Sequence, residues 1–306
     1  MKKLLISFAV ILVGVIYYLV FDGSIPRNSS FDLNIDRVRA LAQAPHNELP
    51  TKINIETLAR NPVPNFVLRA GGHWGEATMN RSVFQIETPR GTVMIEAGMD
   101  ESLAQEYDQA EQFSQQAWLR AQHQMTEAMA ILVTHEHPDH MGGLVRHPSP
   151  QLISSKAILT REQAAGLSRL SPNGELPHAF KDYTPRDLSE PERIAPGIVL
   201  IPAAGHTPGS IMVYVNLASG QEFLFIGDIA YTESNIRDGV DRTRLLRYFM
   251  HDPEDREAVI NQLSALHNLY HTEPSIIIVP AHADKLLTKL IKNGLIYPSP
   301  TSTEPD

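Results

Sequence analysis

The 306-residue chain contains no cysteine, which excludes a disulfide framework, a thiolate metal site and a cysteine nucleophile. Any bound metal would have to be held by histidine, aspartate or glutamate. A basic excess is also missing, because 26 lysines and arginines stand against 35 acidic residues, for a formal net charge of -9. Proteins that bind nucleic acids usually carry excess positive charge, so we expect no nucleic-acid partner.

The first 21 residues differ in character from the rest of the chain. Lys2 and Lys3 precede an uncharged run from Leu4 to Phe21, which at about 1.5 Å per residue can just cross the hydrocarbon core of a membrane. A secretory signal peptide also begins with basic residues, but it usually ends at a small-x-small cleavage site. This run ends in bulky residues, which favours an uncleaved membrane anchor over residues 1–21.

The charges around this segment predict its orientation. Basic residues before a span tend to stay on the cytoplasmic side, so the sequence predicts a single-pass protein of the cytoplasmic (inner) membrane. The body of the chain would then lie on the periplasmic side. Arg27, Arg37 and Arg39 follow the span and argue against this orientation. The alternative is a protein that is secreted after cleavage of the signal.

The remaining chain is predicted to form one α/β domain between a linker and a tail. Five prolines between residues 22 and 64 indicate a linker and membrane-proximal segment. Residues 65–292 alternate short β-rich runs with helical segments, which is typical of sheets covered by helices. Residues 293–306 have the composition of a disordered tail. Strands are expected at 66–70, 82–88, 92–97, 130–134, 157–160, 197–203, 210–217, 222–228 and 275–283, and helices at 99–125, 161–167 and 252–271.

One short stretch concentrates groups that can bind metals. The sequence THEHPDHMGG, residues 134–143, follows a predicted buried strand and contains His135, His137, Asp139 and His140. The two alternating histidines can converge on one ion, and the next two residues, in a turn set up by proline, can face a second. The paired glycines would let this loop turn closely against the site. The alternative is a polar surface loop.

The same pattern recurs at three other predicted strand ends. His206 follows the strand 197–203, Asp228 ends the strand 222–228, and His282 lies at the end of the strand 275–283. Imidazole and carboxylate groups suit zinc, and also iron, manganese or cobalt. We therefore predict a metal site at one edge of the sheets. His73, in the glycine-flanked sequence AGGHWGE, is a weaker candidate for lining a substrate pocket, with packing as the alternative.

The order of these residues resembles the metallo-β-lactamase superfamily of metallohydrolases over roughly residues 65–290. The resemblance implies a four-layer αββα sandwich with two metal ions at one edge between the sheets. It assigns one metal to His135, His137 and His206, the other to Asp139, His140 and His282, and a bridging position to Asp228.

Two such cations, with zinc as the expected metal, would make a bound water acidic enough to form a bridging hydroxide at neutral pH. The hydroxide would attack a carbonyl, or phosphorus in some members, with Asp139 as the catalytic residue that orients it or carries its proton to the leaving group. No side-chain nucleophile is needed, which fits the absence of cysteine. A serine–histidine mechanism has no support in the sequence.

A second stretch bears on the small-molecule substrate. An aspartate at position 228, where many true β-lactamases of the superfamily have cysteine or no ligand, argues against β-lactams. The sequence DIAYTESN, residues 228–235, is similar to the Asp-x-x-Tyr-Thr-x-x-Asn stretch of the N-acyl homoserine lactonases. That similarity makes Tyr231 a hydrogen-bond donor to a lactone carbonyl, with a packed tyrosine as the alternative. The sequence therefore predicts a hydrolase of lactones or similar esters.

Two alternatives stay open. The same fold hydrolyses thioesters in glyoxalase II, and phosphodiesters elsewhere, although a basic glutathione-binding pattern is not evident here. The other alternative is an anchored metal-binding module without turnover. An acyl-chain groove could be formed by Trp74, Phe84, Phe249 and Met250, although such residues are more often core. Four arginines between residues 237 and 247 could bind an anion, but such a run is more typical of a solvated face.

Overall fold

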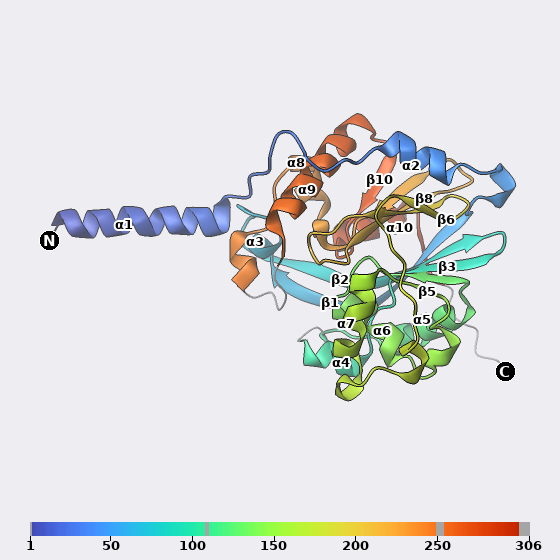
Figure 1. Ribbon diagram of the computed structural model, residues 1–306. Helices are drawn as coiled ribbons and strands as arrows, with labels where there is room; N and C mark the ends of the chain where they lie inside the picture. The colour runs from blue at the N-terminus through green and yellow to red at the C-terminus, as the bar shows by residue number, and fades with distance from the viewer. Residues whose placement is uncertain (1, 108–109, 249–253, 300–306) are drawn as a thin grey trace.

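The computed structural model describes residues 2–107, 110–248 and 254–299. Over these residues the strands form a six-stranded sheet in the order β11-β1-β2-β3-β4-β5 and a five-stranded sheet in the order β10-β9-β8-β7-β6 (Figure 1). The strands are β1 (Lys52–Pro64), β2 (Glu76–Thr88), β3 (Gly91–Ile95), β4 (Ala130–Leu132), β5 (Ala157–Ile158), β6 (Glu192–Ala195), β7 (Ile198–Pro202), β8 (Ile211–Asn216), β9 (Glu222–Phe225), β10 (Ile276–Val279) and β11 (Tyr297–Pro298).

The described residues also form helices, several of which cover the outer faces of the two sheets. They are α1 (Lys2–Ile16), which η1 (Tyr17–Phe21) continues, α2 (Ile35–Ala42), α3 (Asn65–Leu68), α4 (Glu101–Glu106), α5 (Gln115–Glu127), α6 (Pro138–Arg146), α7 (Arg161–Leu170), α8 (Glu233–Asp238), η7 (Arg244–Tyr248), α9 (Arg256–Thr272) and α10 (Asp284–Lys292). Apolar residues of α5, α6 and α7 pack on the six-stranded sheet, and those of α2 and α9 pack on the five-stranded sheet. The result is four layers in the order αββα.

The central core lies between the two sheets, because every second apolar side chain of a strand points to that side. On β2, Phe84 and Ile86 point inward, while Val83 points outward toward the helices. On β9, Phe225 points inward, and its ring centroid lies 4.8 Å from that of Phe84. Successive side chains of a strand point to opposite faces, so a strand buried on both faces is apolar throughout. Phe84 is therefore a core residue, only 2% exposed, rather than part of an acyl-chain groove.

The segment over residues 22–64, predicted as a linker, ends too late, because its last 13 residues belong to the six-stranded sheet. Residues 52–64 form β1, which pairs antiparallel with β2 along its whole length. Helix α2 packs its Val38 and Ala42 side chains on the five-stranded sheet. Two of the arginines that argued against the predicted orientation form ion pairs with the domain, Arg37 with Glu190 and Arg39 with Glu222 and Glu273.

Three other local predictions are corrected. Residues 66–70 were expected to be a strand, but residues 65–68 form the short helix α3. The single helix expected over 99–125 is two helices, α4 and α5. The loop expected after His137 is helix α6 from residue 138 onward, so the glycine pair lies inside a helix.

The glycines of α6 are required for close packing rather than for a turn. A Cβ atom at Gly143 would lie 2.0 Å from the carbonyl oxygen of Ala97, and the Gly143 amide donates a 2.6 Å hydrogen bond to the oxygen of Gly98. The helix that carries two candidate ligands can therefore approach the end of β3 only with glycine at this position.

The C-terminal segment also differs from expectation where it is described. Residues 297–298 form β11, which pairs parallel with β1, and the Ser299 amide donates to the oxygen of Ile55. Residues 300–306 lie outside the described residues. Helix α9 begins at Arg256 with Asp255 as its N-cap, and the start expected at Asp252 lies outside the described residues.

Helix α1 and η1 project from the body of the protein (Figure 1). Residues 2–21 form a continuous apolar helix of 20 residues, long and apolar enough to cross a membrane, with none of its most hydrophobic window buried inside the protein. A signal sequence near the N-terminus would pass the same test.

Candidate metal centre

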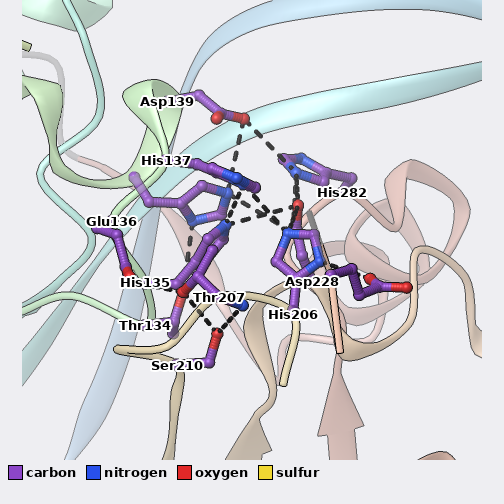
Figure 2. Close-up of polar contacts among 12 residues, drawn as sticks. Thr134, His135, Glu136, His137, Asp139, His206, Thr207, Ser210, Asp228 and His282 are labelled. Atoms are coloured by element: carbon purple, nitrogen blue, oxygen red, sulfur yellow. Dashed lines mark hydrogen bonds and ion pairs between the residues drawn. The ribbon is translucent and has the colours of Figure 1, made fainter. Parts of the chain in front are cut away.

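The candidate ligands come from strand ends of both sheets. His135 and the residues up to His140 follow β4 of the six-stranded sheet, whereas His206, Asp228 and His282 follow β7, β9 and β10 of the five-stranded sheet. Because these strand ends meet at one edge of the sandwich, the ligand side chains turn toward one another (Figure 2). All seven candidate ligands from the sequence are brought together in two adjoining clusters.

The first cluster contains His135, His137, His206 and Asp228, and its donor atoms lie within 4.8 Å of one another. His137 Nδ1 lies 3.0 Å from His135 Nε2 and 3.1 Å from His206 Nε2. Asp228 Oδ2 lies 3.7 Å from His135 Nε2 and 3.5 Å from His206 Nε2. Three imidazoles and one carboxylate therefore face one point.

The second cluster contains Asp139, His140 and His282, also within 4.8 Å. Asp139 Oδ2 lies 3.6 Å from His140 Nε2 and 3.5 Å from His282 Nε2. Asp228 Oδ1 lies 3.6 Å from His140 Nε2 and 2.9 Å from His282 Nε2. Asp228 thus lies between the two clusters, with Oδ1 closest to His282 and with Oδ2, which faces the first cluster, also 3.2 Å from His282 Nε2.

Helix α6 fixes two of these ligands. His137 is its N-cap residue and Pro138 occupies its first position, where the missing amide costs no hydrogen bond. Asp139 and His140 lie in the first turn. The carboxylate is favoured there because the N-terminus of a helix carries partial positive charge.

Buried acidic residues orient the ligand rings from outside. His140 Nδ1 lies 3.1 Å from Glu96 Oε1, and the Thr134 hydroxyl donates to the same oxygen at 2.5 Å. His206 Nδ1 lies 2.9 Å from Glu254 Oε2. These contacts leave the Nε2 atom of each ring directed at the cluster, as second-layer carboxylates do in metal sites.

Two of these groups were not predicted from the sequence. Glu96 follows a strand end, the same signal that identified the ligands, so the pattern could have revealed it. Glu254 gives no comparable signal, and its partner Arg242 was expected on a solvated face. The Arg242 side chain is instead buried, pairs with Glu254 and lies over the ring of Tyr231, with its guanidinium carbon 4.5 Å from the centroid.

Glu136 lies between two ligands in sequence but outside both clusters. Its carboxylate accepts hydrogen bonds from the Thr207 hydroxyl at 2.6 Å and the Gly209 amide at 3.0 Å. Glu136 therefore joins the loop after β4 to the loop that carries His206, which holds ligands from the two sheets in register.

Arg81 adds a buried cation to the second cluster. Its Nε lies 2.8 Å from Asp139 Oδ2, and both side chains are almost fully buried. Arg81 Nη1 also lies 3.2 Å from His282 Nδ1, which in turn lies 2.6 Å from the carbonyl oxygen of Asn80. Strand β2 thereby positions one carboxylate and one imidazole of the cluster.

The electrostatics of the two clusters differ. Burial and the neighbouring histidines lower the pKa of His135 well below its usual value and that of His137 to about 3, so both rings are neutral, the form in which imidazole binds a metal. Burial lowers the pKa of His140 too, but Glu96, Asp139 and Asp228 outweigh burial and raise it to about 10. Burial also disfavours ionised Asp228, yet His282 and His140 hold its pKa well below the usual range.

The residues present fit a pair of divalent cations. Within the described part of the chain, His140 Nε2 and Asp228 Oδ1 are buried and make no hydrogen bond, and their ion-pair contacts are all with other candidate ligands. A buried polar atom without a partner is costly, and both atoms point into the space between the ligands. A cation between them would satisfy both, and the imidazole and carboxylate set suits metals such as zinc.

A cavity of about 400 Å³ adjoins this centre. His282 reaches its wall from the metal side, and His73 lines it from the loop after α3. Tyr231 is not one of the residues that line the cavity; it is buried, only 8% exposed, with its ring centroid 5.7 Å from that of His282. Trp74 is 80% exposed and points away from the core. Phe249 and Met250 lie outside the described residues.

Comparisons with known proteins agree with this geometry. The family model of the metallo-β-lactamase superfamily matches residues 78–282, which include all seven candidate ligands. The chain belongs to the metallo-β-lactamase superfamily. The prediction of a metal-dependent hydrolase similar to the lactonases of this superfamily is thereby confirmed. A comparison with curated protein sequences gives no match.

Solved structures share the metallo-β-lactamase fold at low sequence identity. A quorum-quenching N-acyl homoserine lactone lactonase is 17% identical with a TM-score of 0.59, covering 79% of this chain and 95% of its own. An N-acyl homoserine lactone hydrolase with N-hexanoyl-L-homoserine bound at its metal centre is 17% identical, with a TM-score of 0.58 and coverages of 79% and 96%. A dizinc quorum-quenching lactonase is 13% identical, with a TM-score of 0.52 and coverages of 77% and 90%.

Proposed function

We propose that this protein is a dinuclear-metal hydrolase that opens a lactone or a similar carboxylic ester, and that its N-terminal helix anchors it in a membrane. The position of Asp228 carries the dinuclear part of the proposal. Its Oδ2 lies 3.5 Å from His206 Nε2 and its Oδ1 2.9 Å from His282 Nε2, so one carboxylate serves both clusters. Two divalent ions, with zinc as the expected metal, would supply an acidified water as nucleophile and a Lewis acid for the carbonyl.

The protein's own residues would divide the remaining tasks. Asp139, held by Arg81 at 2.8 Å, stays ionised and can take a proton and pass it to the leaving oxygen. The hydroxyl of Tyr231 would donate a hydrogen bond to the carbonyl oxygen under attack, which stabilises the charge that develops there. The cavity beside His282 has about 400 Å³, within the range of small-molecule sites, and would hold the rest of the substrate.

Two observations support a lactone or ester over other bonds. Residues 228–235 are similar to the lactonase-type stretch, and the solved structures of similar fold include a lactone hydrolase with its product at the metal centre and a dizinc lactonase in complex with a product. The experiment follows acid release from an N-acyl homoserine lactone by the zinc-loaded full chain, with Asp228→Ala alongside. We expect turnover by the wild type and a loss of orders of magnitude in the variant.

The same assay distinguishes the other hydrolases of this fold. A thioester and an activated phosphodiester are offered to the same preparation after its content of two metal ions has been verified. Turnover of either compound, without turnover of the lactone, would replace the lactone proposal. Hydrolysis of none of the three by the two-metal protein would favour a module that binds metal without turnover.

The membrane proposal places the catalytic domain on the periplasmic side of the cytoplasmic membrane. Because the chain has no cysteine, single cysteines can report topology without background. We expect a membrane-impermeant maleimide to label Ser219→Cys, at an exposed turn, in cells with a permeable outer membrane, and Lys3→Cys only after lysis. Recovery of the protein in the soluble fraction without its first residues would instead indicate a cleaved signal.

A further inference from the structure

The wall of the cavity and the end of the N-terminal helix share one loop. This loop runs from Arg69 to Gly75, after α3, and Gly71, Gly72 and His73 line the cavity. On its other side, the Gly71 amide donates a 3.0 Å hydrogen bond to the carbonyl oxygen of Val20. The last turn of a helix leaves carbonyl groups without partners, and here the cavity loop supplies one.

A second segment fixes the same end of the helix. The Arg244 guanidinium lies 4.5 Å from the ring centroid of Tyr18, and its Nη2 lies 2.8 Å from Asp22 Oδ2. The Asp241 amide donates to the oxygen of Gly23 at 2.9 Å. The chain therefore passes from helix to domain without a free linker, so the orientation of the cavity relative to the helix is set.

The length of the helix determines the depth of the loop. Residues 2–21 span about 30 Å at 1.5 Å per residue, the thickness of a bilayer's hydrocarbon core. If this helix crosses the membrane, Val20 lies at the boundary with the headgroups. A loop whose amide is hydrogen-bonded to Val20 must lie in the same layer.

Exposed aromatic residues lie at this level. Trp74 is 80% exposed and packs beside Phe66 of α3, with ring centroids 5.5 Å apart. Tyr17 and Tyr248 are each 61% exposed. Figure 1 shows α3 next to the end of the helix that carries η1. Tryptophan and tyrosine are the side chains that favour the interface between lipid and water, so a bilayer is the surface that matches this patch.

We infer that the loop Arg69–Gly75 and its aromatic neighbours rest on the membrane surface, and that the cavity takes its substrate from the bilayer. The substrate class is then an amphiphilic lactone or ester, whose acyl chain partitions into lipid while its polar head reaches His282. This inference rests on the proposed anchor and hydrolase, and it adds the source and the chemistry of the substrate.

The two tryptophans of the chain allow a direct test without turnover. Trp118 is 3% exposed and packs on the six-stranded sheet, so only Trp74 can meet lipid. The full-length protein is placed in nanodiscs containing phospholipids brominated near the headgroup. We expect bromine to quench the wild-type fluorescence, and the Trp74→Phe variant, which keeps Trp118, to lose that quenching. Equal quenching of the two proteins would overturn the inference. So would wild-type fluorescence that is the same in nanodiscs with and without bromine.

Turnover tests the substrate class separately. In nanodiscs, Trp74→Ser should reduce kcat/KM for dodecanoyl homoserine lactone by about tenfold, which corresponds to ~1.4 kcal/mol, and leave the butanoyl compound unchanged. Leu119→Ser is the matched control, because Leu119 is 54% exposed on α5, far from α1 in Figure 1. Equal losses for both chain lengths would overturn the substrate class. Quenching without any lactone turnover would contradict only the proposed function.

Discussion

Glu254 Oε2 lies 2.9 Å from His206 Nδ1 and at the same time forms an ion pair with the buried Arg242. Burial opposes the charge on Glu254, but Arg242 outweighs it and lowers the pKa of this carboxyl to about 2. A carboxylate that is held ionised makes the opposite nitrogen of His206 a stronger metal donor. Arg242 therefore influences the metal centre through Glu254 and His206, without contacting a candidate ligand itself.

Glu254→Gln keeps the shape of this contact and removes its charge. We expect the affinity for the metal beside His206 to fall by about 10- to 100-fold, the usual effect of losing such a partner. Competition with a chromophoric chelator measures it. Glu257→Gln, at an exposed position of α9, is the control and should bind metal like the wild type. Unchanged affinity in Glu254→Gln would mean that this carboxylate only packs against His206.

Arg81→Met should destabilise the metal-free protein more than the metal-loaded protein. Without metal, Asp139 loses its cation partner inside the protein, which costs about 3–5 kcal/mol of unfolding free energy. A bound cation would replace part of the missing charge, so the loss should shrink when zinc is added. Urea unfolding with and without zinc tests this. Arg60→Met removes a half-exposed partner of Asp284 and should cost under about 1 kcal/mol.

Tyr231→Phe tests the hydroxyl alone. If that group donates to the carbonyl oxygen, kcat for lactones should fall by about 100-fold or more, as when other donors to a developing oxyanion are removed. Metal content should not change. Tyr270→Phe on α9, whose hydroxyl contacts Glu233, serves as the control. A normal kcat in Tyr231→Phe would leave this tyrosine a packing residue against Leu68 and Met79.

Gly143→Ala should displace helix α6, because the added Cβ would lie 2.0 Å from the Ala97 oxygen. Overpacking of this kind costs about 1–3 kcal/mol, and the helix start that carries Asp139 and His140 would move with it. We expect a lower midpoint of thermal unfolding together with weaker metal binding. Gly14→Ala, with nothing within 4 Å of its added Cβ, should change neither.

Metal binding should be strongly pH dependent because of His140. Its pKa of about 10 means that the ring is protonated at neutral pH in the metal-free protein. A metal must displace that proton, so affinity should rise by about tenfold per pH unit between pH 6 and 9. Dissociation constants measured across this range give the slope. A flat profile would show that His140 is already neutral or is not a ligand.

The candidate ligands could be selected from the sequence because they obey a simple rule. Each lies just after an apolar strand or in the first helical turn that follows it, and the fold brings those strand ends to one edge, so residues distant in sequence become neighbours in space. Glu96 obeys the same rule, but it was not predicted because a single acidic residue after a strand does not by itself indicate a site. Glu254 could not be found this way, since its contact with His206 depends on how α9 packs against the sheet.

The boundary of the domain was predicted poorly for a different reason. Strand β1 carries buried polar residues, including Asn54 and Glu56, which interrupt the apolar pattern that identifies strands. Glu56 is paired with Arg120 of α5, and Asn54 donates to Glu87 of β2. These partners lie far away in the sequence, so the residues look like linker until the fold is known. The run at residues 66–70 is too short for periodicity to separate helix from strand.

The division of ligands between the two sheets has a consequence for folding. The segment after β4 provides two donors to each cluster, and the rest come from residues 206, 228 and 282, which follow strands of the other sheet. A nascent chain that has folded only its first half therefore holds no complete ligand set for either of the two proposed ions. Tight metal capture has to wait until both halves have docked, so metal uptake would report the completion of the tertiary structure.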